Sequence, residues 1–237
     1  MLFAVLVSGS CFAQFRTNWY TQPKQNKEKY FLSIGYGWGK AYWYSELSRT
    51  SIYDKQGSTL ESGSFKFKAN NTTSFYDLNV LCPVAGFRLG LGMNFEKFYL
   101  TKLELKQSVT TNKVVIFDET FRFDKIFVQA EFPFWPEARS RFSLSANARF
   151  GFFSFNNVER INFFGDDALA SSLFIAVSPV ADVQLYPGIY LFMQPFAEYK
   201  YFKNPSVDPG GAVMHNIFTY SAMFGLRIDP SMYDQYK

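Results

Sequence analysis

The chain has 237 residues, of which 48% are hydrophobic and 20% aromatic, with 29 Phe, 15 Tyr and 4 Trp. This composition excludes a disordered chain, and the length suits one all-β barrel domain without a linker. The net charge of +4 comes from 24 basic and 20 acidic residues that are mixed along the sequence, so we expect no nucleic-acid partner.

The N-terminal segment has the pattern of an export signal. Residues 1–13 form an uncharged apolar run, and Cys11 and Ala13 are small residues at the minus-three and minus-one positions of a cleavage site. We interpret residues 1–13 as a signal peptide and the polar residues 14–29 as a periplasmic leader. A lipid anchor on Cys11 and a buried N-terminal strand are the alternatives.

Two features limit how such an exported protein is stabilised. After cleavage Cys82 is the only cysteine, which excludes an internal disulfide. No stretch approaches eighteen consecutive apolar residues, so no transmembrane helix is expected. The sequence therefore predicts either a soluble exported protein or a membrane barrel.

The rest of the chain alternates apolar and polar residues with a period of two, the pattern of half-buried strands. We predict eight strands, each near the length of about 9 to 11 residues that a tilted strand needs to cross a bilayer. Pro179 and Pro195 predict local breaks in two of them. In chain order, the predicted strands contain residues 32–38, 87–93, 99–105, 126–134, 142–152, 173–185, 191–201 and 218–228.

The connections between the predicted strands alternate between long and short. A long polar loop, 45–83, follows the first strand, and a tight turn is predicted at Asn94 to Lys97. This asymmetry predicts one rim of tight turns, which also holds both chain ends, and an opposite rim of extended loops. The later gaps are long at 107–117, 156–171 and 204–215 and short at 136–140 and 186–188.

In strand count, alternation, loop asymmetry and export signal, residues 30–229 resemble the small outer-membrane β-barrel proteins of the OmpA and OmpX type. The resemblance implies an all-β fold, an eight-stranded antiparallel up-and-down transmembrane β-barrel, in the outer membrane of a Gram-negative bacterium. The last strand, with Phe224-Gly225-Leu226, looks like the signal that the barrel-insertion machinery recognises. Outer-membrane lipid and this machinery are the implied partners. Residues 230–237 are expected to be a C-terminal tail, and no peptidoglycan-binding domain is expected.

The composition of the two strand faces indicates which of them points outward. One face carries many glycines and serines, such as Ser33, Gly35 and Gly37, which suit a crowded barrel interior. The other face is rich in Phe, Leu, Tyr and Trp, and lipid tolerates such a surface where water does not. The alternative is a soluble lipocalin-like barrel with the apolar face turned inward around an apolar ligand.

The polar face also carries charged residues of both signs. Charges in a narrow barrel interior must be paired, so we expect a salt-bridged plug, with a narrow ion pathway as the alternative. The predicted interior charge network consists of Arg88, Lys102, Glu104, Lys106, Glu131, Arg149, Asp182, Glu198, Lys200 and Arg227.

Groups suited to catalysis are scarce. His215 is the only histidine, which excludes a multi-histidine metal site. Some small barrels that modify lipid A carry a histidine and a serine near the outer rim, but Ile217 stands where the deacylase pattern has serine. We therefore expect no enzyme activity and no cofactor, with a lipid A modifying enzyme that uses His215 as an alternative. The expected role is structural, adhesive or partner-binding, through contacts of loop 45–83 with an envelope protein or an extracellular ligand.

Overall fold

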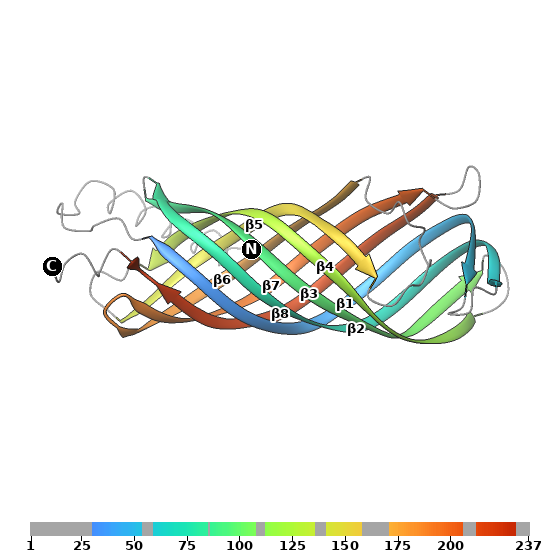
Figure 1. Ribbon diagram of the computed structural model, residues 1–237, viewed down its shortest axis with the longest axis horizontal. Coiled ribbons are helices and arrows are strands. Elements are labelled where there is room, and N and C mark those ends of the chain that lie inside the picture. Colours follow the sequence, from blue (N-terminus) through green and yellow to red (C-terminus); the bar gives the residue numbers. More distant parts are fainter. Residues whose placement is uncertain are drawn as a thin grey trace, which may run out of the picture.

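The computed structural model describes residues 30–53, 59–84, 86–107, 112–135, 141–157, 171–205 and 212–230. These residues form eight antiparallel strands that close into a barrel, in which β8 pairs with β1. The strands cross the long axis obliquely (Figure 1), as barrel closure requires. The fold class predicted from the sequence is confirmed. The strands are β1 (Phe31–Tyr53), β2 (Thr59–Val84), β3 (Phe87–Gln107), β4 (Asn112–Trp135), β5 (Phe142–Asn157), β6 (Ser171–Tyr186), β7 (Ile189–Pro205) and β8 (Ala212–Ile228).

Several predicted segments fall outside this description. The predicted signal peptide (1–13), the leader (14–29) and residues 231–237 of the predicted tail lie outside the described residues. The described ranges contain no helix that is long and apolar enough to cross a membrane.

The apolar face of the strands points outward and the polar face points inward. On β1, Leu32, Ile34 and Trp38 are 52%, 55% and 52% exposed, whereas Ser33 between them is fully buried. The same alternation continues on the other strands, so large apolar side chains cover the outer wall. Water does not tolerate a surface of this kind, and lipid does. The arrangement is that of a transmembrane barrel and is opposite to the one that a lipocalin-like ligand cavity needs.

The predicted loop 45–83 is wrong, because β2 occupies residues 59–84. Around Asn71 and Thr73 this strand carries polar residues on its inward face as well as on its outward face, so the contrast between faces is lost from the sequence. The ladder between β1 and β2 nevertheless runs from Phe31 with Leu81 to Tyr53 with Thr59. The period-two signal fails wherever both faces of a strand are polar.

The predicted tight turn at Asn94 to Lys97 is also wrong, because β3 continues through it. Asn94 and Glu96 point inward and are 4% and 1% exposed, whereas Lys97 lies on the outer wall. Two predicted strands, 87–93 and 99–105, are therefore parts of one strand. The predicted number of strands is right because this split compensates for the missed β2.

The two prolines interrupt a ladder as predicted. The β6–β7 ladder passes from Val177 with Ala197 to Ala181 with Met193 and has no paired residues between them. Pro179 and Pro195 lie in this gap, where neither can donate a backbone hydrogen bond.

One rim of the barrel holds the tight turns, the start of β1 and the end of β8. Gly86 (φ 94°) lies between β2 and β3, and Gly188 (φ 77°) lies between β6 and β7; glycine adopts these angles without steric cost. Leu32 near the start of β1 pairs with Ile228 at the end of β8, so both lie at this rim. We call it the turn rim and the opposite one the far rim.

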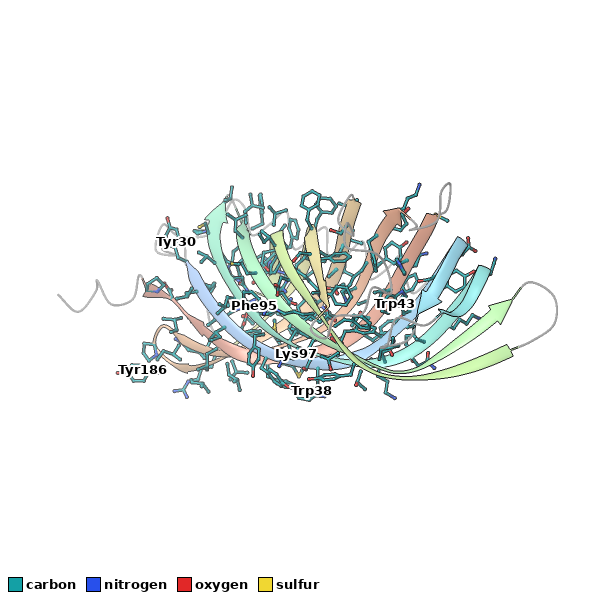
Figure 2. The ribbon with its side chains drawn as sticks, turned by 45° about the vertical axis from the view of Figure 1, so that its right-hand side comes forward. Tyr30, Trp38, Trp43, Phe95, Lys97 and Tyr186 are labelled. Atoms are coloured by element: carbon teal, nitrogen blue, oxygen red, sulfur yellow. The ribbon has the colours of Figure 1, made fainter. Side chains whose placement is uncertain are left out.

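At the far rim, β1 to β4 extend past the other strands. They contain 23, 26, 21 and 24 residues, whereas β5 to β8 contain 16 or 17. The β4–β5 ladder begins only at Phe121 with Asn157, although β4 pairs with β3 from Asn112 onward. Figure 2 shows the β3–β4 hairpin projecting at this end. We call residues 49–53, 59–68, 101–107 and 112–120 the far-rim extension.

Candidate functional site: the barrel interior

A cluster of four charged side chains fills the barrel near the turn rim. The Arg227 guanidinium contacts Glu131 at 2.8 Å and Asp182 at 3.0 Å, and Arg88 contacts Glu131 at 2.7 Å. Arg227, Glu131 and Asp182 are almost fully buried. Two arginines face two carboxylates, so this turn-rim cluster is neutral.

A central ion pair lies further along the barrel axis. The Arg149 Nη1 atom lies 2.7 Å from Asp77 Oδ2, and its guanidinium packs between the rings of Phe127 and Phe196 at 4.5 and 4.6 Å. Asn79 and Asn94 donate hydrogen bonds to the same carboxylate at 2.8 and 3.1 Å. The Asp77 carboxylate is thus satisfied by three side chains, which offsets the cost of burying it.

A second neutral cluster follows toward the far rim. Glu96 accepts from Lys125 at 2.6 Å and from Lys200 at 3.0 Å. The same two lysines contact Glu198 at 2.7 and 2.5 Å. We call these four residues the far-rim cluster. Thr219 also accepts a hydrogen bond from Lys200 at 2.9 Å.

An aromatic layer lies beyond the far-rim cluster. The Trp43 ring centroid lies 5.4 Å from that of Phe98, 5.9 Å from that of Phe121 and 6.1 Å from that of Phe202. Trp43 is 1% exposed and points into the barrel, whereas Trp38 on the same strand lies on the outer wall (Figure 2). The aromatic layer consists of Trp43, Phe98, Phe121, Phe123, Phe153, Phe202 and His215.

His215 belongs to the aromatic layer and faces the interior. Its ring stacks on Phe202 with centroids 4.1 Å apart. The Trp43 Nε1 atom donates to Ser45 Oγ at 2.8 Å and to His215 Nδ1 at 3.1 Å, and Ser45 Oγ is also hydrogen-bonded to His215 Nδ1. Ser45 and His215 are both fully buried, so this pair does not face lipid.

The structure places seven of the ten predicted network residues in these groups. Arg88, Glu131, Asp182 and Arg227 form the turn-rim cluster, and Glu198 and Lys200 belong to the far-rim cluster, with Arg149 between them. The other three predicted residues belong to β3, where only their backbone is described: Lys102, Glu104 and Lys106.

Three members of the network were not among the residues predicted from the sequence. Asp77 lies in the predicted loop 45–83, and Glu96 lies in the predicted turn. Lys125 lies one residue before the predicted strand 126–134. It is on the same face as Gln129 and Glu131, so extending the alternation of that strand toward its N-terminus predicts it as an interior residue. With these residues, the two clusters and the central pair hold five basic and five acidic side chains.

The described ranges contain no group of three or more His, Cys, Asp or Glu side chains arranged to hold a metal ion.

The ion pair between Lys66 and Glu46, 2.9 Å apart, is exposed and lies outside the barrel interior. It lies on the outer wall toward the far-rim extension, where the hydrogen bond from Lys66 lowers the pKa of Glu46.

No protein-family model and no curated protein matches the sequence. Among solved structures, OprG of Pseudomonas aeruginosa is similar at 10% identity, covering 85% of this chain and 95% of that one, with a TM-score of 0.48. The outer-membrane protease OmpT of Escherichia coli is similar at 9% identity, covering 89% and 99%, with a TM-score of 0.40. The Neisserial surface protein NspA is similar at 12% identity, covering 82% and 96%, with a TM-score of 0.42. The closed barrel itself, with lipid-compatible apolar side chains outside and charges inside, makes the chain a small eight-stranded membrane β-barrel of the outer-membrane type.

Proposed function

We propose that the chain is a non-enzymatic outer-membrane protein of a Gram-negative bacterium, in which a closed, salt-bridged barrel carries the far-rim extension as a partner-binding surface. Short turns, together with the start of the first strand and the end of the last, mark the periplasmic side of such barrels. The turn rim therefore faces the periplasm, and the far-rim extension faces the outside of the cell.

The observation that carries this proposal is the continuous filling of the interior. On the inward face of β8, the side chains of His215, Ile217, Thr219, Met223 and Arg227 are at most 3% exposed, and the smaller Ser221 between them is half-buried. This stretch of strand spans roughly 40 Å, or roughly 30 Å along the axis of a barrel with tilted strands, which is about the thickness of the hydrocarbon core. Neutral charge clusters and aromatic rings occupy that depth, so no water-filled path is expected.

Planar-bilayer recording tests the closed interior. We expect the purified protein to insert without producing discrete conductance steps, because moving an ion through would require breaking buried ion pairs. A porin reconstituted in the same way is the positive control. Reproducible steps that scale with the amount of inserted protein would contradict the closed barrel and favour the ion pathway.

A lipid-modifying enzyme is the second candidate, and the Ser45–His215 hydrogen bond is the observation that favours it. A Ser–His pair activates a nucleophile only where the substrate reaches it. Both residues are fully buried on the inward face of β1 and β8, where the His215 ring packs against Trp43 and Phe202. This placement supports the non-enzymatic proposal.

Shortening the far-rim extension tests the partner-binding role. Replacing residues 49–63 by a short turn removes the tip of the β1–β2 hairpin but leaves the wall, which pairs from Leu47 with Phe65 toward the turn rim. We expect the shortened protein to insert normally. We also expect it to lose the crosslinks to envelope proteins or surface ligands that the full chain forms in intact cells.

The matched control keeps the hairpin length and replaces Arg141, an exposed residue at the turn rim, by glutamine. Its crosslinks are expected to persist. Crosslinks that survive the shortening unchanged would place partner binding elsewhere on the barrel.

A further inference from the structure

The outer wall of β1 to β4 changes from apolar to polar at one row of cross-strand neighbours. The row consists of Trp38, Ser74, Lys97 and Arg122, each paired with the next across the sheet. The next row toward the turn rim consists of Tyr36, Tyr76, Phe95 and Asp124. The row after it, four residues from the first, consists of the exposed apolar residues Ile34, Leu78, Met93 and Ile126. Lys97 and Arg122 therefore lie at the far-rim boundary of the apolar band, at the depth of lipid head groups.

Lys97 and Arg122 are like charges on directly opposite residues. In such a pair the Cβ atoms lie about 5 Å apart, and the repulsion destabilises the sheet. Arg122 contacts Asp124 at 2.7 Å, but Lys97 forms no ion pair with any residue in the described part of the chain. The pair carries one positive charge more than its carboxylate neutralises, so an anion bound there would relieve the repulsion.

The two side chains lie beside apolar surface. The Arg122 guanidinium lies 5.7 Å from the ring centroid of Phe95, and Phe95 precedes Lys97 by two residues on the same face of β3. Tyr36 and Tyr76 pack against each other in the adjoining row, with ring centroids 5.1 Å apart. Lys97 and Trp38 lie on the same part of the wall (Figure 2). A ligand at this position therefore meets two cations at one end, Phe95 and the Asp124 carboxylate that is paired with Arg122 in the next row, and aliphatic side chains beyond them.

We propose that Lys97 and Arg122 bind a phosphate group of a phosphorylated glycolipid in the outer leaflet, with its acyl chains packed along Phe95, Met93 and Ile126. The guanidinium supplies paired donors that match phosphate oxygens, and the ammonium supplies a point charge. This site rests on the proposed outer-membrane location, because only there does the far rim face a leaflet of phosphorylated glycolipid.

Lipid titration followed by native mass spectrometry tests the site. The purified full chain in detergent is titrated with bisphosphorylated lipid A, with the same lipid after enzymatic removal of its phosphates, and with inorganic phosphate. We expect the wild-type protein to retain the phosphorylated lipid preferentially. Equal retention of the dephosphorylated lipid, or binding of inorganic phosphate without retention of the lipid, would overturn the proposal.

Substitutions assign the binding to the two side chains. A basic side chain near an anionic lipid surface strengthens association about fivefold, so Lys97→Gln with Arg122→Gln should weaken retention about 25-fold. Lys66→Gln is the control, because Lys66 is also exposed on the outer wall but is paired with Glu46. Unchanged retention by the double variant would overturn the proposal.

Two further readouts separate the possible causes of failure. Should the double variant lack the heat-modifiable folded form, the single variant Lys97→Gln is used, with a loss of about fivefold expected. Sedimentation of the wild-type protein with outer membranes is measured independently. A failure there contradicts the proposed function, whereas a correctly inserted barrel that does not select phosphorylated lipid contradicts only the lipid site.

Discussion

Replacement of Glu131 by alanine is expected to destabilise the barrel by about 3–5 kcal/mol, because it leaves an uncompensated charge in a buried cluster. Glu131 accepts from Arg88 at 2.7 Å and from Arg227 at 2.8 Å and is itself fully buried. Without it, Asp182 faces two arginines alone. The measurement is the urea midpoint of the folded form in lipid vesicles, followed by its heat-modifiable mobility on gels.

A rescue variant separates the effect of charge from that of packing. In Glu131→Ala combined with Arg88→Met, the remaining Arg227 and Asp182 neutralise each other at 3.0 Å. We expect the double variant to recover part of the lost stability. The control Glu46→Gln breaks an exposed pair and should cost no more than about 1 kcal/mol. A Glu131→Ala protein as stable as this control would show that the turn-rim cluster does not support the fold.

Replacement of Trp43 by alanine is expected to cost about 3–5 kcal/mol for a different reason, the cavity left in the aromatic layer. Trp43 contacts Phe98, Phe121 and Phe202 with its ring and is 1% exposed. It also donates a hydrogen bond to Ser45 at 2.8 Å. The measurement is again the urea midpoint of the folded form in vesicles. It is followed by gel mobility, because the substitution removes a tryptophan and would change a fluorescence readout.

The matched variant Trp43→Phe keeps most of the ring volume and removes the indole donor. We expect it to lose about 1–3 kcal/mol, mainly for the Ser45 and His215 acceptors that lose their donor. Equal losses in the alanine and phenylalanine variants would show that the hydrogen bonds, and not ring packing, stabilise this end of the interior.

The strands that cross the apolar band could be predicted because their two faces differ strongly. On β5, Phe150 and Phe152 face lipid, whereas Asn147 and Arg149 face the interior. The same contrast predicted β8, and it correctly predicted that the apolar face points outward. The barrel class follows from this alternation together with the number of strands.

The segments that the sequence does not predict correctly lack that contrast. β2 carries Asn70 and Thr72 outward and Asn71 and Thr73 inward, so it has the composition of a loop although all four residues pair with β1. The Glu96 side chain has the polarity of a turn residue, but inside the barrel two lysines neutralise it. Such a residue is recognised only when its partners from β4 and β7 are known.

The aromatic layer could not be predicted for a related reason. The chain has 29 Phe, and those in the described strands occupy both faces of the wall, as Phe152 outward and Phe153 inward illustrate. Trp43 and Phe98 pack inward because the neighbouring strands bring further rings against them. Residue type alone does not distinguish these rings from those that face lipid.

Heat-modifiability after membrane fractionation tests the central claim most directly, namely that this is a membrane-inserted barrel with its apolar face in lipid. The protein is expressed with its N-terminal segment intact, membranes are separated by density, and samples are run on gels with and without boiling. We predict sedimentation with the outer membrane and a compact, SDS-resistant form that shifts on boiling. A soluble periplasmic protein without a shift would contradict the account and would reverse the assignment of the two strand faces.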